Sequence, residues 1–222
     1  LNLTTCTLIF FGGIGFLVIM DVLKRRNFRK LALHSKVVLT TSIVLIVLGT
    51  VLLKFTEHIS WMGAFFHSIS ARTAGFSTYS IGEFTNAGLF VLCVLMFIGA
   101  SPGSTGGGIK TSTFFVLAQS TRSMFSKQAV GAFKRSISSQ NVSKAYAISM
   151  LSALVVIVAT FLLCVLEPEF QFIQLLFEVI SAFGTVGLST GITPDLSGAG
   201  KLVIILVMFI GRLGAMTLIS MW

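Results

Sequence analysis

Thr73-Ala74-Gly75-Phe76-Ser77-Thr78 is a short loop sequence that returns 112 residues later as Thr185-Val186-Gly187-Leu188-Ser189-Thr190. The same offset continues into the following segment, where Phe97-Ile98-Gly99 becomes Phe209-Ile210-Gly211. Because the offset holds well beyond the loop, a whole structural unit has been duplicated. In each copy the Thr-x-Gly-apolar loop lies between two long apolar runs, which is the arrangement of an ion-selective pore loop.

The composition places the chain among membrane proteins. It has 222 residues, of which 55% are hydrophobic and only 10% charged, whereas a soluble domain has about 25% charged residues. The net charge of +9 comes largely from two basic clusters, Lys24, Arg25, Arg26, Arg29, Lys30 and Lys36, and Arg122, Lys127, Lys134, Arg135 and Lys144. Both clusters join apolar runs, so we interpret their charge as that of loops at a membrane surface and not of a nucleic-acid interface. The chain is therefore predicted to lie in a lipid membrane and to bind no nucleic acid.

Each copy contains an apolar run that is too short to cross a membrane. Met62–Ala71 has ten residues, so a helix there is about 15 Å long, half of a bilayer core of about 30 Å. Phe170–Phe183 precedes the second loop in the same way. We interpret both runs as re-entrant pore helices. The predicted fold class is an all-α membrane protein with tandem helix–pore loop–helix repeats of the potassium-channel type around a central pore.

This topology separates the charges of the chain. Both basic clusters fall on one face, and five of the seven acidic residues fall on the other with the loops: Glu57, Glu83, Glu167, Glu169 and Asp195. Basic loops mark the cytoplasmic side, so we expect a cell-membrane protein whose pore loops open outward. The predicted parts are the last helix of a preceding repeat (1–22), a cytoplasmic loop (23–36), a third repeat with a broken second helix (37–121), a second cytoplasmic loop (122–144) and a fourth repeat (145–222).

The two repeated loops are candidate cation sites. Backbone without regular structure is tolerated at membrane depth only where it lines a cavity or is buried in protein. A potassium filter replaces the water of the ion with carbonyl oxygens, and glycine reaches the required positive φ without strain. The negative end of each pore helix also favours a cation, and neither loop carries an acid. The predicted potassium ligands are the carbonyl groups of Thr73, Ala74, Gly75, Phe76, Thr185, Val186, Gly187 and Leu188.

The segment after Phe97 cannot be a continuous helix, because a proline and a run of glycines interrupt it. It nearly matches a phosphate-binding P-loop, but Lys110 follows Ile109 rather than a glycine, so nucleotide binding is not expected. A flexible kink is one interpretation. We favour a gate, because small residues allow a polar segment below the filter to move aside. The candidate gate residues here are Gly99, Ser101, Pro102, Gly103, Ser104, Thr105, Gly106, Gly107, Gly108 and Lys110.

Arg212 is the other candidate gate residue. It follows Lys201, the expected start of its helix, by 11 residues, which places it about 16 Å into a core about 30 Å thick. A charge at that depth is costly and usually faces a cavity or a partner. We expect it to face the pore, to oppose cation passage and to meet the gate segment. Snorkelling to the cytoplasmic interface is the alternative.

The sequence does not decide the roles of the other polar residues near the loops. Arg72 precedes the first loop and Glu178 lies on the second pore helix, so the two could form a pair that braces adjacent loops, or both could be exposed at the outer vestibule. The histidines His34, His58 and His67 have no metal-ligand spacing, and no role is predicted for them.

The chain resembles the Trk/Ktr/HKT superfamily of potassium transporters, and within it the Ktr-type membrane subunits. The residues that carry the resemblance are the two loops, the stretch from Gly103 to Thr111 and Gly211-Arg212-Leu213-Gly214. The resemblance implies four repeats around one pore, of which this sequence holds the end of the second and all of the third and fourth. It also implies an intramembrane gate loop and a pore arginine. A homodimer, an octameric cytoplasmic ring of nucleotide-binding regulatory subunits and sodium as an activating ion are further family traits.

The predicted function is therefore channel-like potassium uptake, with no enzymatic activity. One alternative is an ion-coupled secondary transporter, in which broken helices bind the substrate and the coupling ion at the midplane. Another is a membrane scaffold without transport, which would tolerate bulky residues in place of Gly75 and Gly187.

Overall fold

A computed structural model describes residues 2–126, 130–133 and 135–214. Its helices are α1 (Asn2–Ile14), α2 (Phe16–Arg25), α3 (Leu33–Thr56), α4 (Trp61–Ser70), α5 (Asn86–Phe97), α6 (Thr111–Ser126), α7 (Ser139–Leu166), α8 (Phe172–Gly184) and α9 (Gly198–Leu213). Short 3-10 turns cover Phe28–Lys30, Ile81–Glu83 and Thr193–Asp195, and β1 (Gly131–Ala132) pairs antiparallel with β2 (Arg135–Ser136). Lys127 and Lys134 of the second basic cluster, and residues 215–222 of the last expected helix, lie outside the described residues.

Helices α3 and α7 have the length of membrane spans. They contain 24 and 28 residues, and both are apolar enough to cross a bilayer. The two predicted half-length helices form as α4 and α8, with 10 and 13 residues. Each has a defined start: the Ser60 hydroxyl accepts from the N–H of Gly63 at 3.0 Å, and Gln171 and Gln174 form a capping box. The fold is mainly helical, as predicted.

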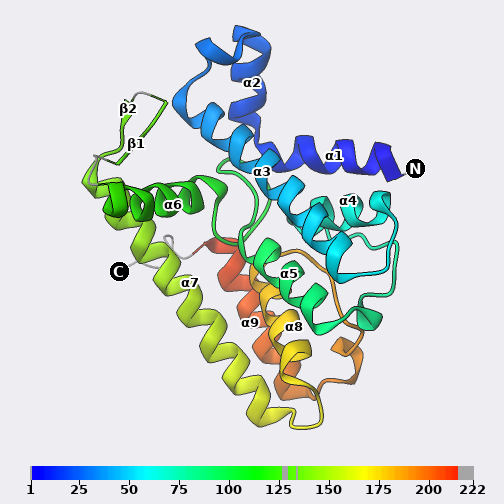
Figure 1. Ribbon diagram of the computed structural model, residues 1–222. Helices are drawn as coiled ribbons and strands as arrows, with labels where there is room; N and C mark the ends of the chain where they lie inside the picture. Colours follow the sequence, from blue (N-terminus) through cyan, green and yellow to red (C-terminus); the bar gives the residue numbers. More distant parts are fainter. Residues whose placement is uncertain (1, 127–129, 134, 215–222) are drawn as a thin grey trace.

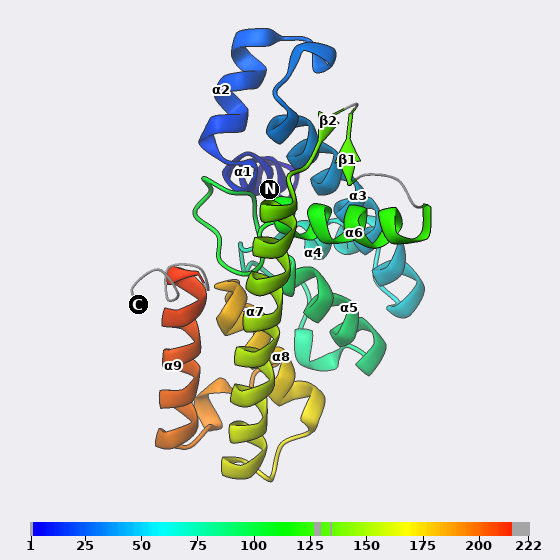
Figure 2. The same cartoon turned by 90° about the vertical axis from the view of Figure 1, so that its left-hand side faces the viewer.

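The helices form two groups (Figures 1 and 2). Helices α3, α4 and α5 pack together, and α7, α8 and α9 form the second group; α5 packs against α8 and joins them. The shared core contains Leu53, Leu92, Met96, Leu163, Phe177 and Phe183, all fully or almost fully buried. Large apolar side chains such as Ile157, Phe161 and Val165 of α7 are exposed, as expected of a helix that meets lipid.

In each repeat, a glutamate at the end of the long helix binds the residue just before the helix that follows the loop. Glu57, at the end of α3, accepts from the N–H and hydroxyl of Thr85 at 3.0 and 2.7 Å, just before α5. Glu167, at the end of α7, accepts from the N–H of Ser197 at 2.9 Å, just before α9. The Glu57 carboxylate thus lies at the positive end of α5 and the Glu167 carboxylate at that of α9, where a negative charge is stabilising. Thr85 and Ser197 are 112 residues apart, so the duplicated sequence forms duplicated contacts.

One expected helix is in fact two. Residues 1–22 were expected to form a single helix, but α1 and α2 bend by 96° at Gly15, which has a φ of 89°. The cause is a neighbouring segment that enters the bend. Ser101 donates from its N–H and its hydroxyl to the carbonyl of Gly13, at 3.0 and 2.8 Å, and the N–H of Phe16 donates to Gly103 at 3.4 Å. These bonds replace the intrahelical ones that the bend removes.

Candidate ion-conduction site

The first loop is held against the end of its pore helix. The N–H groups of Ala74 and Gly75 both donate to the carbonyl of Ser70, at 3.0 and 3.2 Å. The hydroxyl of Ser70 donates to the carbonyl of Phe76. Thr73 and Gly75 have φ angles of 74° and 80°, a conformation that glycine adopts without strain and threonine rarely adopts. One serine therefore holds residues 74, 75 and 76 of the loop against the end of the pore helix.

The second loop is built in the same way around Ser181. The hydroxyl of Ser181 donates to the carbonyl of Leu188 at 2.6 Å and accepts from the N–H of Gly187 at 3.2 Å. Thr185 and Gly187 have φ angles of 51° and 93°. The sequence prediction missed both serines. At the loop offset of 112, Ser70 aligns with Ala182 and not with Ser181. The reason is that Ser70 lies six residues before the carbonyl that it binds, whereas Ser181 lies seven residues before its own.

The two loops meet at their glycines. A Cβ atom on Gly75 would overlap the carbonyl oxygen of Val186 and would lie 3.2 Å from the Cα of Gly187. Real Cβ contacts are almost never this close to backbone atoms, so only glycine fits at position 75. The structure thus brings together the two loops that the sequence predicts as one filter, although 112 residues separate them.

The predicted gate segment lies against the first residue of both loops. The N–H of Gly107 donates to the hydroxyl of Thr185 at 2.9 Å. A Cβ on Gly106 would overlap the hydroxyl oxygen of Thr73, and one on Gly107 would lie 2.7 Å from that of Thr185. Two consecutive glycines therefore allow the segment to approach both loops at once.

The ends of the gate segment are tied to each other. The N–H of Ile109 donates to Phe97 at 3.1 Å, and that of Thr111 donates to Ala100 at 3.3 Å. A Cβ on Gly99 would overlap the carbonyl oxygen of Gly107. Residues 97–100 and 107–111 thus form a narrow neck, where the two ends of the segment between α5 and α6 lie side by side. Gly103 and Thr105, at the far end of the segment, are exposed. The helix break predicted at Gly99–Gly108 is therefore present as a compact loop.

Two cationic side chains bind carbonyl groups of this segment. Arg212, in the last turn of α9, donates from Nη1 to the carbonyl of Thr105. Lys110 donates from Nζ to the carbonyl of Gly106. The structure thus places Arg212 and Lys110, both candidate gate residues from the sequence, against the backbone of this segment.

Two further residues, Glu178 and His67, also bind the loops. The sequence gave no role to His67, and it offered Glu178 only as a partner of Arg72 or as an exposed residue. Glu178 accepts from the hydroxyl and the N–H of Thr190 at 3.0 and 2.8 Å, and also from Ser189 and Thr193, both at 2.8 Å. In the first copy, His67 bonds the hydroxyl of Ser77 through Nε2 at 3.0 Å. His67 and Glu178 are 111 residues apart, the same separation as Ser70 and Ser181.

Neither interpretation of Arg72 and Glu178 was correct. Both side chains are buried, with exposed fractions of 7% and 6%, so they do not line an open vestibule. They do not pair with each other either. Glu178 binds the second loop, whereas Arg72 donates to the carbonyls of Ser42 and Gly99 at 3.4 and 3.5 Å.

Two helices long and apolar enough to cross a bilayer, and two glycine loops that meet beside a helix break, are typical of an integral membrane transport protein. The chain belongs to the TrkH family, described as cation transport proteins, which matches residues 1–221. This is a family of transporters and not of enzymes, as the sequence predicted.

Known relatives agree with this assignment. The chain is 42% identical over 235 residues to Ktr system potassium uptake protein B of Vibrio alginolyticus, covering 99% of this chain and 51% of that protein. It is 39% identical over 236 residues to the potassium/sodium uptake protein NtpJ of Enterococcus hirae, covering 99% of this chain and 52% of that protein. The chain therefore spans about half the length of these relatives, and its resemblance to the Ktr-type subunits is confirmed.

The fold also matches a solved structure. The crystal structure of the potassium transporter TrkH from Vibrio parahaemolyticus superposes with a TM-score of 0.79 at 20% identity, over 99% of this chain and 51% of that one. At this identity the similarity establishes the fold, which confirms the predicted class.

Proposed function

We propose that this chain forms half of a channel-like potassium uptake protein of the cell membrane. The observation that carries the proposal is the contact of one glycine segment with both loops, through Gly106 beside Thr73 and Gly107 bonded to Thr185. A pore needs a selective constriction and a means to close it, and here the candidates for both lie against each other. The names of the relatives support potassium as the ion, and NtpJ adds sodium.

The filter consists of the carbonyl groups of residues 73–76 and 185–188. Two half-length helices end at these loops, and the negative ends of their dipoles favour a cation there. No acidic side chain occurs in either loop, so selectivity comes from the number and spacing of carbonyl dipoles. Two further loops, from the part of a full-length protein that corresponds to the unmatched half of the relatives, complete the ring.

The gate is the segment from Gly99 to Thr111 together with Arg212. Its backbone blocks the space below the loops, and Arg212 and Lys110 add two positive charges where a cation would pass. In a low-dielectric surrounding, charges of like sign repel strongly. Opening then requires the segment to move away, which breaks the bonds from Gly107 to Thr185 and from Arg212 to Thr105.

The proposal also covers the membrane topology of the chain and the partners of the whole protein. Residues 1–22 end a second repeat, 37–121 form a third and 145–222 form a fourth, with the basic loops 23–36 and 122–144 in the cytoplasm. The protein acts as a homodimer, and an octameric ring of nucleotide-binding regulatory subunits contacts the basic loops and sets the position of the gate. Sodium acts as an activating ion.

Ion selectivity in proteoliposomes tests the function. Full-length protein is expected to carry potassium at channel-like rates without any coupling gradient and to discriminate against sodium. Ion flux that requires a second, coupled ion would contradict the proposal and favour a secondary transporter. Loss of discrimination in filter variants, with flux retained, would assign selectivity to residues 73–76 and 185–188.

A further inference from the structure

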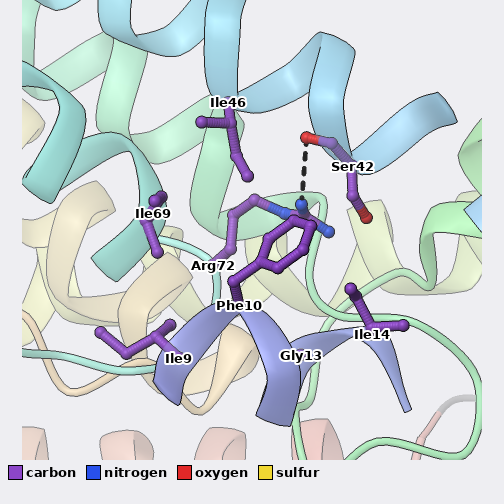
Figure 3. A pocket seen from close by; sticks show the side chains of 8 residues that line it. All are labelled: Ile9, Phe10, Gly13, Ile14, Ser42, Ile46, Ile69 and Arg72. Atoms are coloured by element: carbon purple, nitrogen blue, oxygen red, sulfur yellow. Dashed lines mark hydrogen bonds between the residues drawn. The ribbon is translucent and has the colours of Figure 1, made fainter. Parts of the chain in front are cut away.

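Arg72 occupies an unusual position at the base of the first loop. It directly precedes Thr73 and lies between α1, α3 and α4, in a pocket lined by Ile9, Phe10, Gly13, Ile14, Ser42, Ile46 and Ile69 (Figure 3). Its exposed fraction is 7%. The cavity beside it measures about 10 Å³, which is enough for about one water molecule. The charge is therefore separated from bulk solvent.

This buried charge is balanced by carbonyl groups. No carboxylate forms an ion pair with Arg72 within residues 2–126, 130–133 and 135–214, where the one such pair joins Arg25 to Asp21. Its guanidinium instead donates through Nη1 to Ser42 at 3.4 Å and through Nη2 to Gly99 at 3.5 Å, and its Nε has no partner. Arginine stays protonated in proteins, so this site holds a permanent charge at a cost that an apolar side chain would avoid.

The two acceptors belong to very different parts of the protein. Ser42 lies within α3, a long helix that packs against α4 and α5. Gly99 is the first residue of the gate segment and lies in its neck, where a Cβ would overlap the carbonyl of Gly107. The Arg72 side chain, which directly precedes the first loop, thus binds α3 through Nη1 and the gate segment through Nη2.

We propose that Arg72 couples the first filter loop to the gate segment. In the arrangement described here its guanidinium holds the Gly99 carbonyl, and this bond is lost when the neck moves as the segment opens. The side chain therefore stabilises the closed segment and transmits its position to Thr73. Arg72 is a positioning residue, and this inference rests on the proposed function of the segment as a gate.

The experiment is a double-mutant cycle in the full-length protein, with rubidium or potassium flux into proteoliposomes as the readout. Arg72→Gln is measured with the gate segment intact and with residues 101–108 deleted. We expect about a fivefold rise in resting flux with the segment intact, the change that corresponds to one lost hydrogen bond. With residues 101–108 deleted, we expect less than about a twofold change, because the Gly99 carbonyl that Arg72 binds is then no longer attached to a segment that can close the pore.

The controls separate this role from a structural one. Arg72→Lys keeps the positive charge but has one nitrogen in place of the two that bind Ser42 and Gly99. It should raise resting flux like Arg72→Gln. It also replaces the glutamine variant if that protein does not fold. Lys201→Gln, on an exposed lysine near the start of α9, should have no effect. An equal change in flux from Arg72→Gln in both backgrounds would overturn the inference. If deletion of the segment alone leaves flux unchanged, the gate assignment fails first, and the coupling role fails with it.

Discussion

The backbone N–H of Gly107 donates a 2.9 Å hydrogen bond to the side-chain hydroxyl of Thr185, across 78 residues of sequence. Through this bond the predicted gate is attached to the first residue of a predicted filter loop. The backbone of Gly107 can reach the threonine because it carries no side chain: a Cβ there would lie 2.7 Å from the same oxygen. Under the proposed function, the closed position of this segment therefore depends on the hydroxyl of Thr185.

Removal of the Thr185 hydroxyl should loosen the gate. Thr185→Val keeps the shape of the side chain but leaves the N–H of Gly107 without its partner, which costs about 1 kcal/mol in the closed arrangement. We expect resting potassium flux in proteoliposomes to rise about fivefold. Thr185→Ser keeps the hydroxyl and serves as the control. Equal flux in the valine and serine variants would show that the bond has no part in closure.

Removal of the Arg212 charge should increase conduction. Arg212→Ala deletes the hydrogen bond to Thr105 and a positive charge from the ion path, and bonds from charged donors are worth about 1.5–3 kcal/mol. We expect flux to rise about tenfold or more, with Arg212→Lys giving an intermediate value. If Arg212→Ala conducts like the unmodified protein, the side chain only snorkels to the interface.

The two filter glycines should differ in their tolerance of a side chain. A Cβ on Gly187 meets no atom closer than 3.9 Å, whereas one on Gly75 overlaps Val186. Gly187→Ser should therefore fold but strain a φ of 93°, at a cost of about 1–2 kcal/mol, and weaken potassium-over-sodium discrimination. Gly75→Ser should reduce the yield of folded protein.

Gly191 provides the matched control for this experiment, because its φ is 99° and a Cβ there would have no atom within 4 Å. Gly191→Ser introduces the same backbone strain outside the filter. Reversal potentials in mixed potassium and sodium solutions give the measurement. Unchanged discrimination in Gly187→Ser would remove the second loop from the filter.

Neutralisation of Glu178 should destabilise the second loop. The carboxylate accepts bonds from Ser189, Thr190 and Thr193, and Glu178→Gln replaces one accepting oxygen by a donor. We expect a loss of about 1–3 kcal/mol of local stability, seen as a lower thermal transition of the detergent-purified protein and as weaker selectivity. Glu169→Gln, on an exposed residue just before α8, should change neither quantity.

The sequence predicted the parts of this site better than the contacts between them. Half-length helices and the break at Gly99 follow from local rules of length and helix propensity, and these are present. Ser70, Ser181 and His67 were missed because the pore helices repeat at 111 residues and the loops at 112. Glu178 was named from the sequence, but with Arg72 and not the second loop as its partner. One extra residue between Ser181 and Thr185 accounts for the difference, and an alignment of each pore helix by itself would have paired the serines.

The bend at Gly15 and the burial of Arg72 depend on tertiary contacts. An apolar run with scattered glycines is compatible with a straight helix. Only the bonds that Ser101 donates to Gly13 and Phe16 donates to Gly103 explain why α1 ends at Ile14. Arg72 follows a helix end in a polar stretch, which is typical of an exposed residue. Its acceptors lie in segments 30 and 27 residues away in sequence, and no local pattern indicates them.

Potassium flux through the full-length protein with residues 101–108 deleted tests the central claim most directly. The deletion removes the segment that contacts both loops and the carbonyl that Arg212 binds, while both filter loops remain. We predict a large rise in resting flux with potassium-over-sodium discrimination preserved, measured in proteoliposomes on protein that elutes as a single folded species. Flux that falls, or stays the same, in such protein would contradict the assignment of this segment as the gate.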